Sequence, residues 1–262
     1  MATSNPAGDN PLVSVILTTR DRPRLFSTAL RCYAHQTYPH RELLVIDDGD
    51  EYPVAERSIA ALGGRLIRAA PGTVLGTKLN LGLAEARGAF CQKMDDDDWY
   101  APRFLELMVA AVRRNWERAC RRFLAFLTPF LFFEVARWEV RRSVHNNVPG
   151  ATLFFAHEDW RESPFRALPG DEDVWFFRDQ LRLGSTPLAV RALEHYLAVR
   201  HRGMSGERGH TWVMQGDGQL LESYLQDREL YPGGPQALLP DWAHAFYAEL
   251  RRDVLAAEKP DE

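Results

Sequence analysis

The sequence has few cysteines, no excess of positive charge and no apolar stretch long enough to span a membrane. Cys32, Cys91 and Cys120 do not have the spacing of a metal site and cannot all pair, which favours a reducing, cytoplasmic setting. The 32 basic and 36 acidic residues give a net charge of −4, so the chain offers no global positive field, and we expect no nucleic-acid partner. The apolar run 123–133 contains Pro129 and is far shorter than the roughly 20 residues of a membrane span.

The length of 262 residues suits one α/β domain with a helical appendage. Residues 1–10 are polar and contain no apolar segment, which predicts a disordered tail and no signal peptide. A basic cluster at 113–122 precedes the apolar run 123–133. We interpret this run as buried strand and connection, with peripheral membrane contact as the minor alternative.

Short apolar runs alternate with helical patterns over the first hundred residues, which is typical of a parallel sheet covered on both faces. The predicted strands cover residues 11–17, 42–46 and 65–68, and the predicted helices cover residues 24–35, 54–62, 83–87 and 103–114. Right-handed crossovers bring the carboxyl ends of such strands to one edge of the sheet. We therefore expect Thr18 and Asp48 at the same edge, where open α/β sheets bind their ligands.

Four consecutive carboxylates, Asp95 to Asp98, follow the short apolar run 88–94. Adjacent carboxylates repel one another, so they require either solvent or a cation, and a solvated acidic loop remains an alternative to a ligand site. The preceding strand and the helix start near Pro102 place them at the same edge of the sheet. Oxygen ligands favour Mg²⁺ or Mn²⁺ over zinc.

Two further segments could contribute to a site. The glycine-containing loop 72–82 precedes the helix predicted at 83–87, and Lys78 could bring charge to a phosphate there, although the glycine spacing matches neither a P-loop nor a dinucleotide fingerprint. The second acidic cluster, 171–173, opens a helix; capping alone could explain Asp171 and Glu172. Asp173 lies deeper in the first turn, where partial desolvation suits a general base.

Several of these segments, in consistent order and spacing, resemble the nucleotide-binding half of family 2 inverting glycosyltransferases, which have the GT-A fold. The matching segments are VSVILTTR from Val13, QTYP from Gln36, ELLVIDDG from Glu42, KLNLGLAEARG from Lys78 and MDDDDWYAP from Met94. The resemblance continues less tightly to Gly170-Asp-Glu-Asp173, which is similar to the Glu-Asp motif of the family.

The resemblance implies a Rossmann-like, mostly parallel sheet flanked by helices, followed by a C-terminal helical extension. Residues 11–110 would form the nucleotide-sugar-binding half and residues 111–215 the acceptor and catalytic half of the same domain. Residues 216–262 would form the extension, whose helices at 220–230 and 240–257 we expect to dock on the main domain or on a second copy, as in a homodimer.

The resemblance also implies roles for individual residues. Asp97 would be the direct ligand of Mn²⁺ or Mg²⁺, Asp95 would contact the ribose or the metal through water, and His201 or His210 would approach the metal. Asp173 would be the catalytic base beside Glu172. The implied donor-binding residues are Thr18, Arg20, Asp48, Lys78, Asp95 and Asp96. Asp96 and Asp98 would also support the turn.

The predicted activity is metal-dependent transfer of one sugar, with inversion, from a nucleotide-diphosphate sugar, first of all a UDP-sugar. The acceptor would be a hydroxyl of a glycan, a lipid-linked sugar or a small molecule. The sequence lacks the Gln-x-x-Arg-Trp motif and the membrane spans of processive synthases, which favours transfer of a single sugar. The alternatives are a nucleotidyltransferase, whose glycine-rich first loop is missing at 18–23, and a non-catalytic nucleotide-sugar binding protein.

Overall fold

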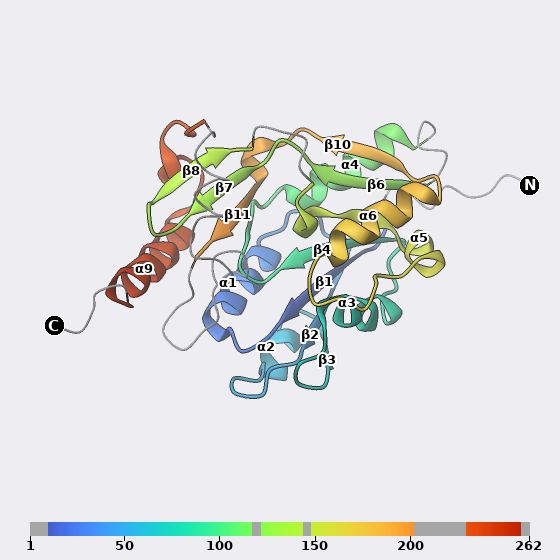
Figure 1. Ribbon diagram of the computed structural model, residues 1–262, viewed down its shortest axis with the longest axis horizontal. Coiled ribbons are helices and arrows are strands. Elements are labelled where there is room, and N and C mark those ends of the chain that lie inside the picture. The colour runs from blue at the N-terminus through green and yellow to red at the C-terminus, as the bar shows by residue number, and fades with distance from the viewer. Residues whose placement is uncertain (1–9, 117–121, 144–147, 202–228, 258–262) are drawn as a thin grey trace, which may run out of the picture.

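The computed structural model describes residues 10–116, 122–143, 148–201 and 229–257, and two sheets form its centre (Figure 1). The strands of the large sheet are β1 (Val13–Thr19), β2 (Arg41–Asp47), β3 (Arg65–Arg68), β4 (Phe90–Asp95), β6 (Phe123–Leu127), β9 (Phe154–Ala156) and β10 (Thr186–Val190). The strands of the small sheet are β5 (Trp99–Tyr100), β7 (Leu131–Glu134), β8 (Glu139–Arg142) and β11 (Tyr196–Arg200). The helices are α1 (Pro23–Ala34), α2 (Glu56–Ala60), α3 (Leu75–Ala84), α4 (Phe104–Asn115), α5 (His157–Glu162), α6 (Glu172–Arg182) and α9 (Asp241–Ala257), with 3₁₀ turns η1 (Gly150–Thr152), η2 (Leu193–His195) and η3 (Gly234–Ala237).

The large sheet has the order β10-β6-β9-β4-β1-β2-β3. β1 runs parallel to β2 and β4, β2 runs parallel to β3, and β6 runs parallel to β10. β9 alone is antiparallel to its neighbours in this sheet. The sheet is therefore mostly parallel, as predicted. The register sets Thr18 opposite Asp95 and Thr19 opposite Asp47, so the polar ends of β1, β2 and β4 meet at one edge.

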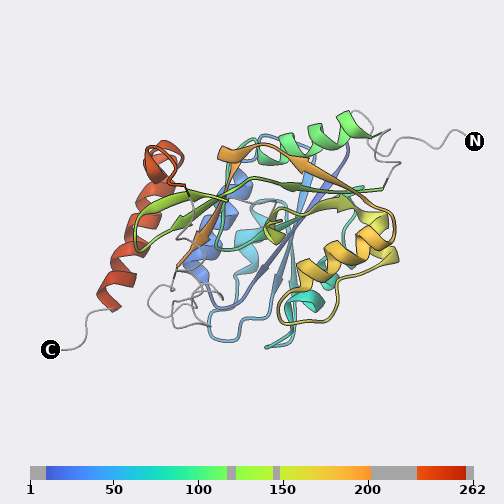
Figure 2. The same ribbon diagram turned by 45° about the horizontal axis from the view of Figure 1, so that its top comes forward.

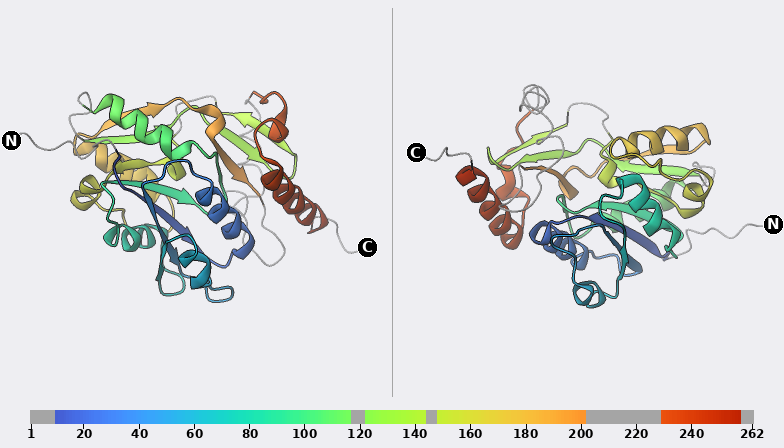
Figure 3. Two further views of the ribbon diagram at one scale, coloured as in Figure 1. Left: turned by 180° about the vertical axis from the view of Figure 1, so that it is seen from behind. Right: turned by 60° about the horizontal axis from the view of Figure 1, so that its bottom comes forward.

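Helices cover both faces of the large sheet, as Figures 2 and 3 show. Leu25 of α1 and Met108 of α4 pack with Val15 in one buried apolar cluster. Leu79 of α3 and Phe176 of α6 pack with Ile16 in the other. Because successive side chains of a strand point to opposite faces, one apolar strand supplies both clusters.

The run 123–133 forms two strands in two different sheets, β6 and β7. Thr128 and Pro129 lie between them and are joined by a cis peptide bond. The short strand β5 follows the four aspartates directly and pairs antiparallel with β11, which pairs with β7. The small sheet thus begins next to the acidic motif. Among the described residues, no helix is long and apolar enough to cross a membrane.

The C-terminal helix α9 docks on its own domain, next to α1 and β7 (Figure 3). The ring of Tyr247 packs edge-on against Phe133 of β7, with centroids 5.4 Å apart. The Arg31 guanidinium of α1 lies 4.5 Å from the centre of the Trp242 ring. This helix matches the one predicted at 240–257, and intramolecular docking was one of the two expected arrangements. The homodimer stays a prediction, and most of the helix predicted at 220–230 lies outside the described residues.

The helix prediction after β3 is wrong in its extent. We expected a loop at 72–82 and a helix from 83, whereas α3 spans Leu75–Ala84. The two glycines inside it allow close packing. A Cβ on Gly76 would lie 1.8 Å from the Arg166 carbonyl oxygen, and a Cβ on Gly82 would lie 2.5 Å from Ile46 Cδ1. Lys78 is therefore a helix residue and not part of a phosphate-binding loop.

Candidate active site

Asp47 and Asp48 stand at the end of β2 and have different surroundings. The Asp47 carboxylate accepts hydrogen bonds from the backbone N–H groups of Gly49 and Val54, each at 2.8 Å, and pairs with Arg68. These contacts fold the loop after β2. Asp47 is thus a turn-forming residue.

Asp48 faces α3 and keeps one oxygen available. Its Oδ1 accepts a hydrogen bond from Lys78 Nζ at 2.6 Å. Its Oδ2 is buried and has no hydrogen-bond partner among the described residues, with Arg20 Nη1 3.9 Å away. The residue as a whole is only 1% exposed. A buried carboxylate oxygen without a donor is costly, so this position suits a ligand that donates a hydrogen bond.

The four aspartates have different surroundings: Asp96, Asp97 and Asp98 are buried, whereas Asp95 is partly exposed. Asp98 points into the protein, where its Oδ1 accepts a hydrogen bond from the Val199 N–H at 2.8 Å and its Oδ2 accepts one from the Tyr196 hydroxyl. Burial, and then the charge of Asp97, raise the pKa of Asp98 well above its ordinary value. Asp98 therefore ties the motif to β11, in line with the support of the turn that we predicted.

Arg22, at the start of α1, binds the middle of the motif. Its Nη1 lies 3.0 Å from Asp96 Oδ1 and 3.1 Å from Asp97 Oδ2. The Thr19 hydroxyl donates to Asp96 Oδ2 at 2.6 Å. Asp96 is thus held by the loop after β1. Our sequence reasoning missed Arg22; the only sequence signal is a basic residue directly before the proline that opens α1.

Asp97 and His201 come together, as the prediction for a metal site requires. His201 Nε2 lies 3.5 Å from Asp97 Oδ2, and the His201 side chain is fully buried. His210 lies outside the described residues. Across the ranges that the structure describes, no group of three or more His, Cys, Asp or Glu side chains forms a ready cage for a metal ion. Asp97 and His201 are the oxygen and nitrogen donors that could contribute to holding a divalent ion here.

Lys93 of β4 links the motif to the start of α6. Its ammonium lies 2.6 Å from Asp95 Oδ1 and 3.8 Å from Glu172 Oε1. Burial raises the pKa of Glu172 to about 7, while the nearby ammonium opposes that rise. Asp95 is the most open of the four aspartates, with 32% of its side chain exposed. The four-aspartate motif and the acidic cluster 171–173 therefore face the same space. Our sequence reasoning missed Lys93, although a lysine inside an apolar strand was a usable signal.

Asp173 is half-buried and packs against the backbone of Gly150 in η1. A Cβ on Gly150 would lie 1.9 Å from Asp173 Oδ2, so the carboxylate can take this position only because residue 150 is a glycine. Asp173 Oδ1 accepts a hydrogen bond from the Val174 N–H at 2.8 Å. Of the two acidic residues that begin α6, Asp173 is thus the one open to solvent, whereas Glu172 is buried.

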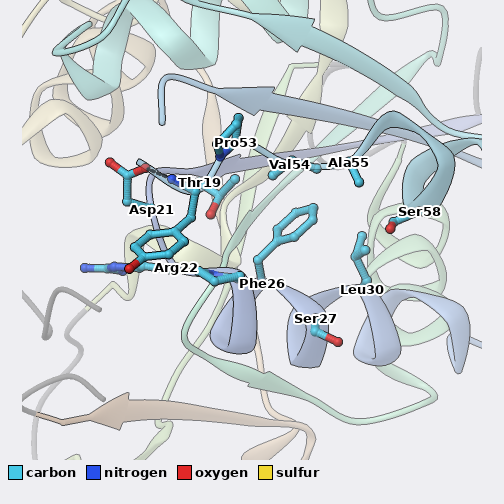
Figure 4. Close-up of a pocket in the computed structure, with 12 residues that line it drawn as sticks. Thr19, Asp21, Arg22, Phe26, Ser27, Leu30, Pro53, Val54, Ala55 and Ser58 are labelled. Atoms are coloured by element: carbon cyan, nitrogen blue, oxygen red, sulfur yellow. Dashed lines mark hydrogen bonds between the residues drawn. The ribbon is translucent and has the colours of Figure 1, made fainter. Parts of the chain in front are cut away.

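A pocket of about 370 Å³ lies on the other side of the motif, between α1 and the segment 52–58 (Figure 4). Its lining includes Thr19 and Arg22, which also bind the motif, and the apolar residues Phe26 and Leu30 of α1. Lys78 and Asp48 are not part of this lining. The pocket is thus lined by residues of α1 and of the loops that follow β1 and β2.

Comparison with known proteins identifies the family. The model of "Glycosyl transferase family 2" matches residues 14–159, more than half of the chain, so the chain belongs to this family. EpsH of Bacillus subtilis (strain 168), a protein assigned to the glycosyltransferases, is 28% identical over 104 residues, which make up 38% of this chain and 30% of EpsH. The predicted family is confirmed.

Solved structures confirm the fold. The S. aureus TarS 1-349 complex with UDP-GlcNAc has a TM-score of 0.58 at 14% identity and covers 95% of this chain and 76% of that one. The mannosyltransferase PcManGT from Pyrobaculum calidifontis, in complex with GDP-Man and Mn²⁺, has a TM-score of 0.58 at 17% identity. This match covers 97% of this chain and 78% of the PcManGT chain. The chain spans 37% of the longer TarS chain. Likeness at such low identity shows the GT-A fold alone.

Proposed function

We propose that the chain transfers a single sugar, with inversion, from a nucleoside-diphosphate sugar to an acceptor hydroxyl. One juxtaposition carries this proposal: Lys93 contacts Asp95 of the motif and lies close to Glu172, next to Asp173, so a metal-binding edge and a candidate base face one space. The bound UDP-GlcNAc of TarS and GDP-Man of PcManGT support a nucleotide-sugar donor. A UDP-sugar is the first candidate to test.

In this proposal each residue has a defined task. Asp48 accepts a hydrogen bond from the nucleotide base through its buried Oδ2, and Lys78 fixes the orientation of that carboxylate. Asp97, Asp95 and His201 would hold Mn²⁺ or Mg²⁺, whose charge would neutralise the leaving diphosphate. Asp173 takes the proton of the acceptor hydroxyl as its oxygen attacks the anomeric carbon opposite the leaving group, which inverts the configuration.

Thermal-shift measurements with nucleoside diphosphates and nucleotide sugars, each with Mn²⁺, test the proposal. A ligand that binds only the folded chain raises its stability with the logarithm of ligand concentration over Kd. We expect stabilisation by at least one nucleoside diphosphate, and slow hydrolysis of the matching nucleotide sugar. If no nucleotide stabilises the chain and no donor is hydrolysed, the proposal is wrong. Binding without hydrolysis would instead indicate a non-catalytic binding protein.

Asp48→Asn should weaken nucleotide binding. An amide keeps the shape of the side chain but removes the charge that faces Lys78 and the ligand. Because a hydrogen bond to a charged group contributes about 1.5–3 kcal/mol, we expect the Kd for the diphosphate to rise about 10- to 100-fold. Isothermal titration calorimetry measures this. Glu51→Gln, an exposed charge change on the same loop, is the matched control, and equal affinities in all three proteins would contradict the role of Asp48.

Gly150→Ala should slow turnover without changing donor affinity. The new Cβ would displace the Asp173 carboxylate, whose Oδ2 lies 1.9 Å from its ideal position. A displacement of about 1 Å at a reacting group can cost up to about 100-fold in rate, so we expect a loss in kcat of about 10- to 100-fold with little change in the donor KM. Gly170→Ala is the matched control, since a Cβ there meets nothing within 4 Å. Equal turnover of the two variants would argue against a dependence on Gly150.

A further inference from the structure

Lys93 is an unusual residue for its position. It lies in the central strand β4, two residues before the four aspartates, and is 3% exposed. Its neighbours Cys91 and Met94 belong to the two apolar clusters of the core. An ion pair in such a place is weak evidence for stability, because a well-packed apolar side chain of similar volume is often as stable or more so. The lysine therefore calls for an explanation from the site that it faces.

The charged groups around the Lys93 ammonium are all acidic residues of the proposed site. Asp95 Oδ1 is in direct contact at 2.6 Å, and Glu172 Oε1 is 3.8 Å away. A lysine ammonium with carboxylates at these distances carries its charge near neutral pH. Lys93 is thus a positive charge fixed between the motif and the start of α6.

Arg22 at the other end of the motif offers a useful comparison. Its side chain is 16% exposed, against 4% for Lys93, and it approaches the motif from the residue that precedes α1. Lys93 is anchored in a central strand and surrounded by protein. A cation that enters the site would compete with Lys93 for Asp95 and would also be repelled by its charge.

We propose that Lys93 is an internal counter-cation of the transfer site, which weakens the binding of the divalent ion and supplies part of the positive charge that neutralises the leaving diphosphate. The inference rests on the proposed function. It assigns Lys93 as an electrostatic positioning residue, and it predicts opposite changes in metal affinity and in turnover when the charge is removed.

Lys93→Met tests this role, because methionine keeps the length of the side chain without its charge. With UDP present, we expect Mn²⁺ to bind about tenfold more tightly than to the unmodified chain, as measured from the EPR signal of free Mn²⁺, since Asp95 is released and the repulsion is lost. With saturating Mn²⁺, we expect kcat for hydrolysis of a UDP-sugar to fall about tenfold. A purely structural disturbance would weaken both. Lys93→Gln serves the same test if Lys93→Met does not fold.

Two further variants act as controls. Lys93→Arg keeps the charge and should keep a Mn²⁺ affinity close to that of the unmodified chain. Arg178→Gln removes an exposed cation of α6, which lies over Trp175, and should change neither quantity. Unchanged or weaker Mn²⁺ binding by Lys93→Met overturns the inference, while UDP binding and donor hydrolysis by the unmodified chain leave the proposed function standing. If no variant binds Mn²⁺, the inference also fails, and hydrolysis in EDTA decides whether transfer survives without metal.

Discussion

Asp173→Asn should remove nearly all sugar transfer and leave donor binding intact. Asparagine fills the same space beside Gly150 but cannot take a proton from an acceptor hydroxyl. Because general base catalysis typically contributes about 10²- to 10⁴-fold, we expect kcat to fall by this factor, with the Kd for the nucleoside diphosphate within about twofold of the unmodified chain. Release of the diphosphate from the donor, followed with time, measures the loss.

Glu172→Gln is the matched comparison, because the two carboxylates are adjacent in sequence and differ in environment. Glu172 is buried and has a pKa raised to about 7, which suits a general base near neutral pH. The hydroxyl of the acceptor substrate, however, has less access to the buried Glu172 than to the half-buried Asp173. We therefore expect a smaller loss in Glu172→Gln. A larger loss in this variant, or near-normal turnover in Asp173→Asn, would move the role of the base to Glu172.

Much of the fold could be predicted because its elements carry local signals. The apolar run 42–46 lies within β2, and the run 65–68 coincides with β3. The strand predicted at 11–17 ends two residues before β1 does, because Thr18 and Thr19 continue the strand although they are polar. Both threonines are buried at the ligand edge, where the requirements of the site override the apolar pattern.

The error at α3 has a different cause. Glycine is a poor helix former, so local propensity favoured a loop around Gly76 and Gly82. The helix forms there because both glycines allow close contact with parts of the chain far away in sequence, one with Arg166 and the other with Ile46. Tertiary packing of this kind leaves no periodic pattern in a single sequence. The length of a helix that packs on two neighbouring elements likewise cannot be read from a periodic pattern in the sequence.

Sequence reasoning proposed the acidic residues and the cations Arg20 and Lys78 for the site, and it missed Arg22 and Lys93. Asp48, Asp97 and Asp173 belong to short sequence motifs that can be recognised in a single sequence. In the structure, the segments that carry these motifs lie at one edge of the large sheet. Arg22 pairs with Asp97 over 75 positions of the chain. Lys93 pairs with Asp95 two residues further along, and it also lies 3.8 Å from Glu172 of α6. Both cations therefore place positive charge beside the acidic motif.

The division of labour within the motif leads to a prediction on stability. Asp98→Ala should lower the free energy of unfolding by about 3 kcal/mol, because it leaves the buried Val199 N–H without an acceptor and the Tyr196 hydroxyl without its partner. Asp98→Asn should cost far less. Its amide oxygen can accept from Val199 and its amide nitrogen can donate to the tyrosine oxygen. Urea denaturation of the three proteins measures the differences.

The small effect expected for Asp98→Asn follows from the burial of this residue. Burial and the neighbouring Asp97 raise the pKa of Asp98 well above its ordinary value, so the charged form is disfavoured here and a neutral amide of the same shape should lose little. If Asp98→Asn were as unstable as Asp98→Ala, the negative charge itself would be required, and Arg200, whose Nη1 lies 3.8 Å from Asp98 Oδ1, would be its partner. If Asp98→Ala were as stable as the unmodified chain, Asp98 would not anchor the motif to β11. Its carboxylate would then have to be reconsidered as part of the metal-binding edge with Asp97.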